Sequence, residues 1–360
     1  MNSTSTPIRT ALVGFGMSGR VFHAPAIASD PRYSLDFIVT SNEERAAAAA
    51  ERYPQATIVP SREELFARAD DLDLMVIATP PYTHVGLAAD GISHGLHVSV
   101  DKPFVVNSDE GTELIERAEK AGVVLTVFQN RRWDEDFLEL RSMIDEGHFG
   151  EVHTFESRFD QWSETCREAQ EAAAESGRKT ASSSKDTGDS AEASGLFFDL
   201  GTRVVEQAKE LFGPVRNVSA DKVRHSMATV GASSEGEPDT YVSLEHDSGV
   251  RSRLWMNRSG PRFRVLGSES TYTKWGWDGQ SWALAAGVLP EEPGTSPSDE
   301  GTWGRLGRDG LVEPVVDTRD SNPDFYSMLS NCLLDGGPVP VDPQGPLEVL
   351  RIMEEIRSAD

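Results

Sequence analysis

The chain has 360 residues, with 59 acidic against 34 basic side chains and a formal net charge of -25. Phosphate backbones and anionic membrane surfaces bind basic protein surface, so this charge argues against nucleic acid or membrane as a partner. The two cysteines form no spaced framework, and no apolar run reaches the roughly 18 residues of a membrane span. We therefore expect a cytoplasmic protein, and its length predicts two domains.

The first part of the chain, from Ile8 to about Val127, alternates short apolar runs with helical segments. The runs that predict strands are "IRTALVGFG", "SLDFIVTS", "LDLMVIATPP", "HVSVDKPF" and "VVLTVFQN". Between them, "SREELFARA", "THVGLAADGISHG" and "SDEGTELIERAEKAG" predict helices, the first of which opens with a capping box from Ser61 to Glu64. Strand–helix alternation at this spacing predicts a parallel sheet with helices on both faces, hence an α/β dinucleotide-binding domain over residues 1–128.

After about Gln129 the pattern changes to period-two alternation, which is typical of antiparallel strands. The strand-like runs are "EVHTFESRFDQW", "VRNVSADKVR", "TYVSLEHDSGVRSRLWMNRS" and "FRVLGSESTYTKWG", with "DSG" as a hairpin turn. "DEDFLELRSMIDEGHFG" predicts a helix that ends at Gly147, and "PLEVLRIMEEIRSA" predicts a terminal helix. We expect a second, α+β domain over residues 129–360, built on a large open and mainly antiparallel sheet.

The segment 164–194 has a different composition from the rest of the chain. It contains no Ile, Leu, Val, Met or aromatic residue. Such a segment buries too little apolar surface to offset the entropy of ordering it, so we predict a mobile insertion. A surface insertion is favoured over a lid on the site.

The loop "GFGMSG" carries the pattern Gly14-x-Gly16-x-x-Gly19 between a predicted strand and a helix. In this context the pattern predicts a dinucleotide site. Gly14 allows the tight turn, Gly16 lets the backbone approach the pyrophosphate, and Gly19 permits close helix packing. The helix N-terminus supplies N–H groups to the phosphates.

The choice between NAD and NADP is expected at the end of the second strand, which reads "VTSNEER". NAD enzymes place a carboxylate here for the ribose 2′-hydroxyl. Thr40, Ser41 and Asn42 are neutral, and Arg45 lies one turn further on, which suits a 2′-phosphate. Glu44 is assigned to a capping box with Ser41. NADP is favoured, and NAD stays possible.

Two further strand ends carry candidate site residues. Lys102 in "VDKPF" follows a buried run, where open α/β sheets bind ligands, and a lysine there can exchange a proton with a substrate hydroxyl. "ATPPYTH" places a Pro-Pro turn and His84 at another strand end, where His84 either lies near the cofactor or faces solvent. His23 is interpreted mainly as structural packing beside the Gly-rich loop.

The segment "FFDLGTRVVEQAKELFGP" raises a separate question. On a helix, Asp199, Arg203 and Glu206 share one face as an acid–base–acid row. The row is either a ladder of surface ion pairs or part of an active site. Leu200, Val204, Val205 and Ala208 are expected to pack against the sheet.

Together, "VGFGMSGRVFHAP", "ATPPYTHVGLA", "VDKPF", "FQNRRWDEDFLELR" and "FFDLGTRVVEQAKELFGP" occur in the order seen in the Gfo/Idh/MocA oxidoreductases. The chain resembles the branch with NADP-dependent scyllo-inositol dehydrogenases. The resemblance implies a Rossmann domain, a sheet whose exposed face forms a homodimer or homotetramer, and a carbohydrate-like small-molecule substrate between the domains. It implies no metal. Lys102 matches the lysine of the family's (E/D)-K-P motif, and the cofactor site then comprises Gly14, Phe15, Gly16, Met17, Ser18, Gly19, Thr40, Ser41, Asn42, Arg45, Thr79, Pro80, Pro81, His84, Asp101, Lys102 and Gln129.

The resemblance also assigns the substrate residues, which are Arg131, Trp133, Trp162, Asp199 and Arg203. Either Arg131 or Arg132 is expected to pair with Asp134 or Asp136. Arg203 stands where the family has a proton-relaying histidine, and a guanidinium has no hydrogen-bond acceptor and stays protonated in proteins. Lys102 is then the main acid/base candidate, with Asp199 and Arg203 as its catalytic partners. The alternatives are a cofactor-binding sensor that has lost the chemistry and a reductase of another C=O, C=N or C=C substrate.

Overall fold

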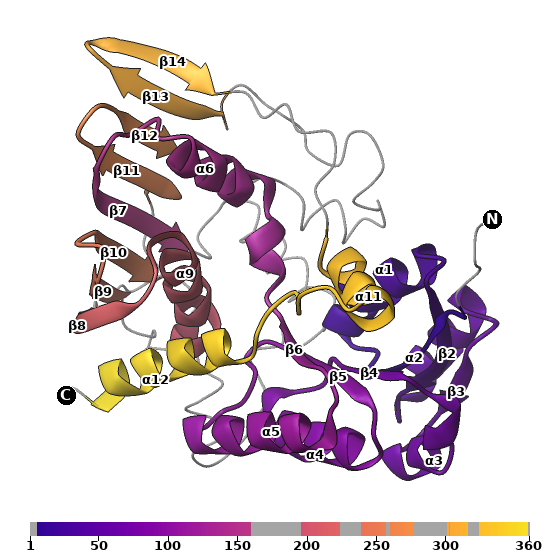
Figure 1. The fold of residues 1–360 in the computed structure, drawn as a ribbon. Coiled ribbons are helices and arrows are strands. Elements are labelled where there is room, and N and C mark those ends of the chain that lie inside the picture. Colours follow the sequence, from indigo (N-terminus) through magenta and orange to yellow (C-terminus); the bar gives the residue numbers. More distant parts are fainter. Residues whose placement is uncertain are drawn as a thin grey trace, which may run out of the picture. The chain divides into compact units, whose positions relative to one another are not determined.

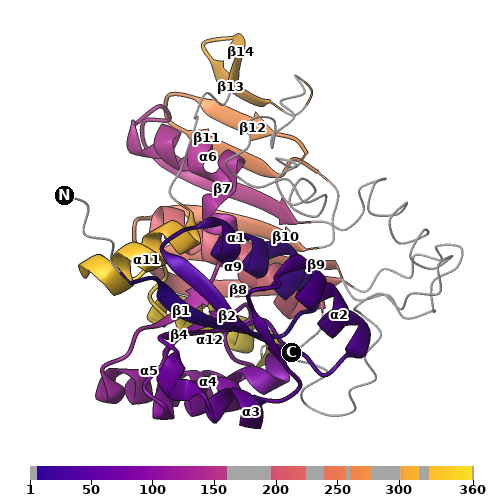
Figure 2. The same cartoon turned by 90° about the vertical axis from the view of Figure 1, so that its right-hand side faces the viewer.

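The computed structural model describes residues 6–159, 196–223, 239–256, 260–276, 301, 303–315 and 324–358. The chain divides into two compact units, each drawn in Figures 1 and 2. Of the described residues, the first unit contains 6–134 and 324–348, and the second contains the others. Trp162 and the whole segment 164–194 lie outside the described residues, so the prediction that this segment is mobile is not tested.

The first unit is built on a six-stranded parallel sheet in the order β3-β2-β1-β4-β5-β6. Its strands are β1 (Ile8–Val13), β2 (Tyr33–Val39), β3 (Thr57–Val59), β4 (Leu74–Ile77), β5 (His97–Asp101) and β6 (Leu125–Phe128). Every residue of β4 and β6 is buried, which is why the sequence shows continuous apolar runs there. The predicted parallel sheet is confirmed, and the short β3 is an additional strand.

The connections between these strands are helical (Figure 1). They are η1 (Gly19–His23), α1 (Ala24–Ser29), α2 (Glu43–Arg52), α3 (Arg62–Phe66), η2 (Ala69–Asp71), η3 (Pro81–Thr83), α4 (His84–Ser93) and α5 (Ser108–Ala121), followed by η4 (Asn130–Trp133). Ser61 caps α3 through the backbone N–H of Glu64, as predicted. The predicted cap of α2 is wrong, because Asn42 rather than Ser41 accepts the backbone N–H of Arg45.

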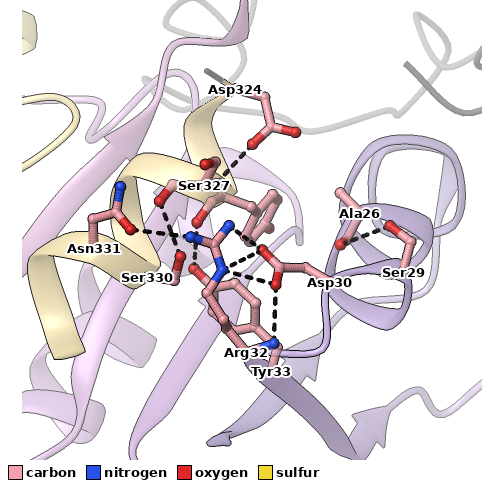
Figure 3. A network of polar contacts seen from close by, with 10 residues as sticks. Ala26, Ser29, Asp30, Arg32, Tyr33, Asp324, Ser327, Ser330 and Asn331 are labelled. Carbon is pink, nitrogen blue, oxygen red and sulfur yellow. Dashed lines mark hydrogen bonds and ion pairs between the residues drawn. The ribbon is translucent and has the colours of Figure 1, made fainter. Parts of the chain in front are cut away.

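A later helix, α11 (Phe325–Asp335), belongs to the same unit as the parallel sheet. Figure 3 shows how polar contacts fasten it near the start of β2. Arg32 binds Asp30 and also donates to the side chain of Asn331 at 3.0 Å. The Tyr33 hydroxyl donates to the carbonyl oxygen of Tyr326 at 2.7 Å. The predicted domain boundary between residues 128 and 129 stays a prediction. The predicted second domain, 129–360, included α11, but the contacts of α11 group it with the first unit.

The second unit contains an eight-stranded sheet in the order β14-β13-β12-β11-β7-β10-β9-β8. Among the described strands of this sheet, only the β7–β10 pairing is parallel, so the sheet is mainly antiparallel, as predicted. Its strands are β7 (Val152–Phe159), β8 (Val215–Val223), β9 (Asp239–His246), β10 (Arg251–Met256), β11 (Phe263–Gly267), β12 (Thr271–Lys274), β13 (Gly304–Arg308) and β14 (Leu311–Val315).

Helices α6 (Glu135–Asp145) and α9 (Leu196–Phe212) pack on one face of this sheet (Figure 2). Phe137 of α6 meets Phe263 of β11, and Leu200, Val204, Val205 and Ala208 of α9 are buried as predicted. Two buried polar pairs also lie beneath α6: Arg262 with Asp136 at 2.5 Å, and Lys274 with Glu139 at 3.8 Å. The last helix, α12 (Gln344–Ser358), begins in the first unit and ends in the second.

The opposite face of the eight-stranded sheet carries partly exposed side chains that stack on one another. The Trp255 ring lies 5.1 Å from the ring of Tyr241 on β9, and the Arg158 guanidinium of β7 lies 3.9 Å above it. Within the described ranges, no helix has the length and apolarity that crossing a membrane requires.

Candidate cofactor and catalytic site

The candidate site residues of the first unit follow the carboxyl ends of the parallel strands. The Gly-rich loop follows β1, Thr40 follows β2, Thr79 follows β4, Asp101 ends β5, and Gln129 follows β6. Parallel strands end at one edge of a sheet, so the fold brings these segments together. β1 lies between β2 and β4, where the strand order reverses direction. The loops after β1 and β4 therefore lie at the switch point where such sheets bind ligands.

The three glycines of the loop meet different surroundings. Gly14 has a φ of 103°, and a Cβ there would lie 2.5 Å from the carbonyl oxygen of Ala78. A Cβ on Gly19 would lie 2.1 Å from the carbonyl oxygen of Gly14. At Gly16 the nearest atom would be an Arg45 guanidinium nitrogen, 3.9 Å away. Gly14 and Gly19 thus let the loop fold back on itself, whereas Gly16 leaves space in front of the backbone. The buried ring of Phe15 packs edge-on against Tyr53 and anchors the loop, and the side chain of Met17 is exposed.

The side chain of Arg45 is the cation nearest to this open backbone. Because Asn42 caps α2, Arg45 lies in its first turn. The short segment before the helix holds Thr40, whose backbone N–H donates to Val59, and the exposed Ser41. Residues 40–42 at the end of β2 are thus neutral where NAD enzymes place a carboxylate for the ribose 2′-hydroxyl, and a guanidinium lies beside Gly16. Glu43 and Glu44 follow in the first turn of α2.

His84 joins the loops that follow β4 and β5. Its Nδ1 lies 2.9 Å from the carbonyl oxygen of Pro103, and its Nε2 lies 2.9 Å from that of Thr79. The side chain is buried, so the alternative in which His84 faces solvent is wrong. The Lys102–Pro103 peptide bond is cis, and His84 holds this turn against the turn of Pro80 and Pro81. The hydroxyls of Thr79 and Thr83 form a further hydrogen bond of 2.6 Å within that turn.

Asp101 connects the Gly-rich loop to the Lys102 turn. Its Oδ2 accepts the Ser18 hydroxyl at 2.5 Å, and its Oδ1 accepts the backbone N–H of Lys102 at 2.7 Å. His23 Nε2 lies 3.7 Å from Oδ2. Burial alone would raise the pKa of this carboxyl, but His23, Ser18 and the charge of Lys102 outweigh it and lower the pKa below its usual value. Asp101 is therefore an ionised carboxylate beside Lys102.

The segment after β6 contains the predicted Arg131 and Trp133. Arg131 donates to Asp134 at 3.0 Å, and both side chains are largely buried, so the predicted ion pair is confirmed for Arg131. Trp133 packs edge-on against Phe325 of α11. Gln129 is buried. Their contacts with a substrate or cofactor stay predictions.

The remaining predicted residues lie on α9 in the second unit. The Arg203 guanidinium lies 4.9 Å from the centre of the Phe159 ring, and Glu206 is buried. The position of the Asp199 side chain is outside the described residues. The surface-ladder interpretation is wrong for Glu206, because a ladder on the surface would leave this side chain exposed.

One contact at the site was not predicted by the sequence. Tyr326 of α11 forms a hydrogen bond of 2.6 Å with His23, which in turn faces Asp101. The two residues are 303 positions apart, and no local motif connects them. The run "PDFYSML" shows only that Tyr326 lies at the start of a helix. Among the described residues, no three His, Cys, Asp or Glu side chains are grouped as a metal site.

Comparisons with known proteins agree with this arrangement. Residues 8–129 match the model of an oxidoreductase family with an NAD-binding Rossmann fold, and residues 137–273 match that family's C-terminal domain. The chain belongs to the Gfo/Idh/MocA family of oxidoreductases, and its first unit is a Rossmann fold of the NAD(P)-binding kind.

Full-length relatives are found among both sequences and structures. The chain is 32% identical to the uncharacterized oxidoreductase YdgJ of Escherichia coli, over 97% of this chain and 95% of that protein. It is 28% identical to the NADP-dependent scyllo-inositol 2-dehydrogenase IolW of Bacillus subtilis, over 96% of this chain and 92% of that protein. A protein of Bacteroides fragilis with a known crystal structure has a similar fold, with a TM-score of 0.79 and 32% sequence identity. The match covers 98% of this chain and 97% of that chain.

Proposed function

We propose that the protein is an NADP-dependent oxidoreductase that transfers a hydride between the nicotinamide and a carbon of a sugar, polyol or inositol. The position of Arg45 carries the choice of cofactor. Its guanidinium lies beside the open backbone of Gly16, and Thr40, Ser41 and Asn42 provide no carboxylate at the end of β2. A guanidinium forms strong charge-assisted hydrogen bonds with a phosphate, whereas a carboxylate there would repel it.

The residues of the loop fit a dinucleotide. The backbone at Gly16 is open on the side where a pyrophosphate would approach, and η1 with α1 begins directly behind it. When bound, the cofactor would supply the hydride acceptor or donor. The protein would contribute Lys102, whose Nζ exchanges a proton with the substrate hydroxyl or carbonyl oxygen.

Asp101 and His84 support this role of Lys102 from two sides. The carboxylate of Asp101 binds the backbone of Lys102, and His84 binds the carbonyl of the next residue, Pro103. Both bonds fix the backbone from which the lysine side chain extends, and a proton donor must be held in a defined place to act.

The substrate class rests on two observations of different kinds. IolW, a relative over nearly the full length, is a scyllo-inositol dehydrogenase. Arg203 occupies the position of the family's histidine and can only donate hydrogen bonds, which favours a carboxylated or otherwise anionic carbohydrate. In this proposal Asp199 positions substrate hydroxyls.

The proposal is tested first by binding. NADPH and NADH are titrated against the protein by nicotinamide fluorescence, with Arg45→Ala as the variant and Arg62→Ala as a control for loss of one surface cation. We expect NADPH to bind more tightly than NADH, and Arg45→Ala to weaken NADPH alone by about tenfold or more, as for one lost charge-assisted bond. Equal affinities in the unaltered protein would reject NADP as the cofactor.

Activity is then tested with polyols, inositols, sugars and sugar acids, and with panels of imines and enones, as substrates. Lys102→Ala should abolish turnover while NADPH still binds, and full retained activity would reject Lys102 as the acid/base. Binding without turnover of any compound would favour a sensor. Turnover confined to imines or enones would favour the other reductase.

A further inference from the structure

A buried chain of polar side chains lies behind the Asp101–Lys102 turn. His23 is fully buried, and its two ring nitrogens face different partners. Nε2 lies 3.7 Å from Asp101, and Nδ1 lies 2.6 Å from the hydroxyl of Tyr326. The members come from η1, the end of β5 and α11, all within the first unit.

Packing gives the His23 ring one orientation. The ring lies 4.2 Å from the ring of Phe128 and meets that of Tyr326 edge-on at 6.1 Å. Tyr326 is itself held in place, because the Tyr33 hydroxyl binds its carbonyl oxygen and the two rings pack edge-on. A flipped ring would break the short bond to Tyr326, so Nε2 is the nitrogen that faces Asp101.

The state of the phenol determines which ring nitrogen carries a proton. Burial raises the pKa of Tyr326 well above its usual value, and Tyr33, Asp101 and Asp324 act in the same direction. The hydroxyl therefore keeps its proton. When it donates this proton to Nδ1, the proton of a neutral imidazole must lie on Nε2, which then points at the carboxylate.

We propose that Tyr326 and His23 are positioning residues for Lys102: Tyr326 holds the His23 ring with an N–H toward Asp101, and Asp101 sets the place and proton affinity of Lys102. This inference rests on the proposed function, in which Lys102 exchanges a proton with the substrate. The Ser18 hydroxyl donates to Oδ2 of the carboxylate and His23 Nε2 faces the same oxygen at 3.7 Å, while Oδ1 accepts the backbone N–H of Lys102. The same carboxylate thus joins the Gly-rich loop to the Lys102 turn.

The direction of the expected effect follows from electrostatics. The N–H of His23 offsets part of the negative charge on Asp101. Without it, the carboxylate attracts the ammonium of Lys102 more strongly and stabilises its charged form. Loss of either positioning residue should therefore raise the pKa of Lys102, although neither residue touches it.

The test is an NMR titration of Lys102 in the full chain labelled with 13C-lysine. The sequence holds only seven lysines, and Lys102→Arg identifies the signal. The variants are Tyr326→Phe and His23→Gln. Tyr33→Phe is the matched control, because it removes a buried hydroxyl that also binds Tyr326 but does not contact His23.

We expect both variants to raise the titration midpoint of Lys102 by about half a pH unit or more, and Tyr33→Phe to leave it unchanged. An unchanged midpoint in Tyr326→Phe, or an equal shift in the control, would overturn the proposal. If His23→Gln does not fold, the result of Tyr326→Phe alone decides. The readout needs neither cofactor nor substrate, so it separates this inference from the proposed function, which NADPH binding and turnover test.

Discussion

Replacing Gly19 by alanine should disrupt the Gly-rich loop itself. The added Cβ would lie 2.1 Å from the carbonyl oxygen of Gly14, and real Cβ contacts essentially never fall below 3.0 Å. The obstructing atom is backbone, so the loop must move by about 1 Å to relieve the overlap. Overpacking costs about 1–3 kcal/mol, and we expect the upper end of this range because no flexible side chain can move aside.

Gly16→Ala is the informative comparison, because the added Cβ would meet nothing closer than 3.9 Å. The fold should tolerate this change, but the methyl group would stand where a pyrophosphate approaches the backbone. We expect NADPH affinity to fall about tenfold or more, equivalent to one lost charge-assisted bond. Gly86→Ala in α4 serves as the control, since it has open space and a helical position where alanine is favoured by about 1 kcal/mol.

The assay combines thermal unfolding with NADPH titration of the three variants. A loss of about 3 kcal/mol corresponds to a fall in Tm of roughly 6–12 °C for a unit of 150–250 residues. Gly19→Ala should lose stability and binding, Gly16→Ala binding only, and Gly86→Ala neither. A Gly19→Ala variant that melts and binds like the parent protein would refute the reasoning, as would a Gly16→Ala variant with a Tm several degrees lower.

Three other predictions concern stability and assembly. The hydrogen bond from Arg9 lowers the pKa of Asp73, so the contribution of this pair to stability is complete above the unfolded pKa of about 3.9 and is lost as pH falls through the folded pKa. Asp73→Asn should cost about 1 kcal/mol or less in thermal unfolding at pH 7, and the cost should shrink as pH falls below about 3.9. Asp136→Asn, which leaves the buried Arg262 without its carboxylate, should cost about 3–5 kcal/mol in urea unfolding. Trp255→Ala should reduce a dimer or tetramer to monomers by native mass measurement, if the proposed assembly uses this sheet face; a parent protein that is already monomeric would contradict it.

Much of the first unit could be predicted because the sequence patterns that indicate its strands and loops lie within short stretches of the chain. The apolar runs of β4 and β6 reflect burial on both faces, and the three glycines that indicate the turn of the loop fall within one stretch of six residues. The cap of α2 shows the limit of such signals. Ser41 and Asn42 are both good cap residues, and only the backbone geometry selects Asn42.

The features that could not be predicted depend on residues far apart in the sequence. No periodicity in the chain shows that α11 groups with β2 or that Tyr326 meets His23. The burial of His84 could not be predicted either, because it results from the contact of two loops that follow different strands. The sequence indicated which segments are candidates for the site, but the pairing of buried polar groups is a property of the tertiary structure.

The structure narrows the interpretation of the acid–base–acid row on α9, which consists of Asp199, Arg203 and Glu206. Glu206 is buried, so it does not belong to a ladder of surface ion pairs. The Arg203 guanidinium lies over the ring of Phe159, and this cation–π contact stabilises a positive charge at that position. A guanidinium donates hydrogen bonds and accepts none, so in the proposed reaction Arg203 can bind an anionic group or a developing alkoxide but cannot receive a proton. The proton must then pass to a group whose pKa the surrounding protein can shift into the working range. The amine of Lys102 is such a group. Lys102 directly follows Asp101, the ionised carboxylate that Ser18 binds and that His23 Nε2 faces at 3.7 Å. In the proposed reaction, with an arginine where the family resemblance implies a proton-relaying histidine, the proton affinity that matters is that of Lys102, and the contacts of Asp101 would set it.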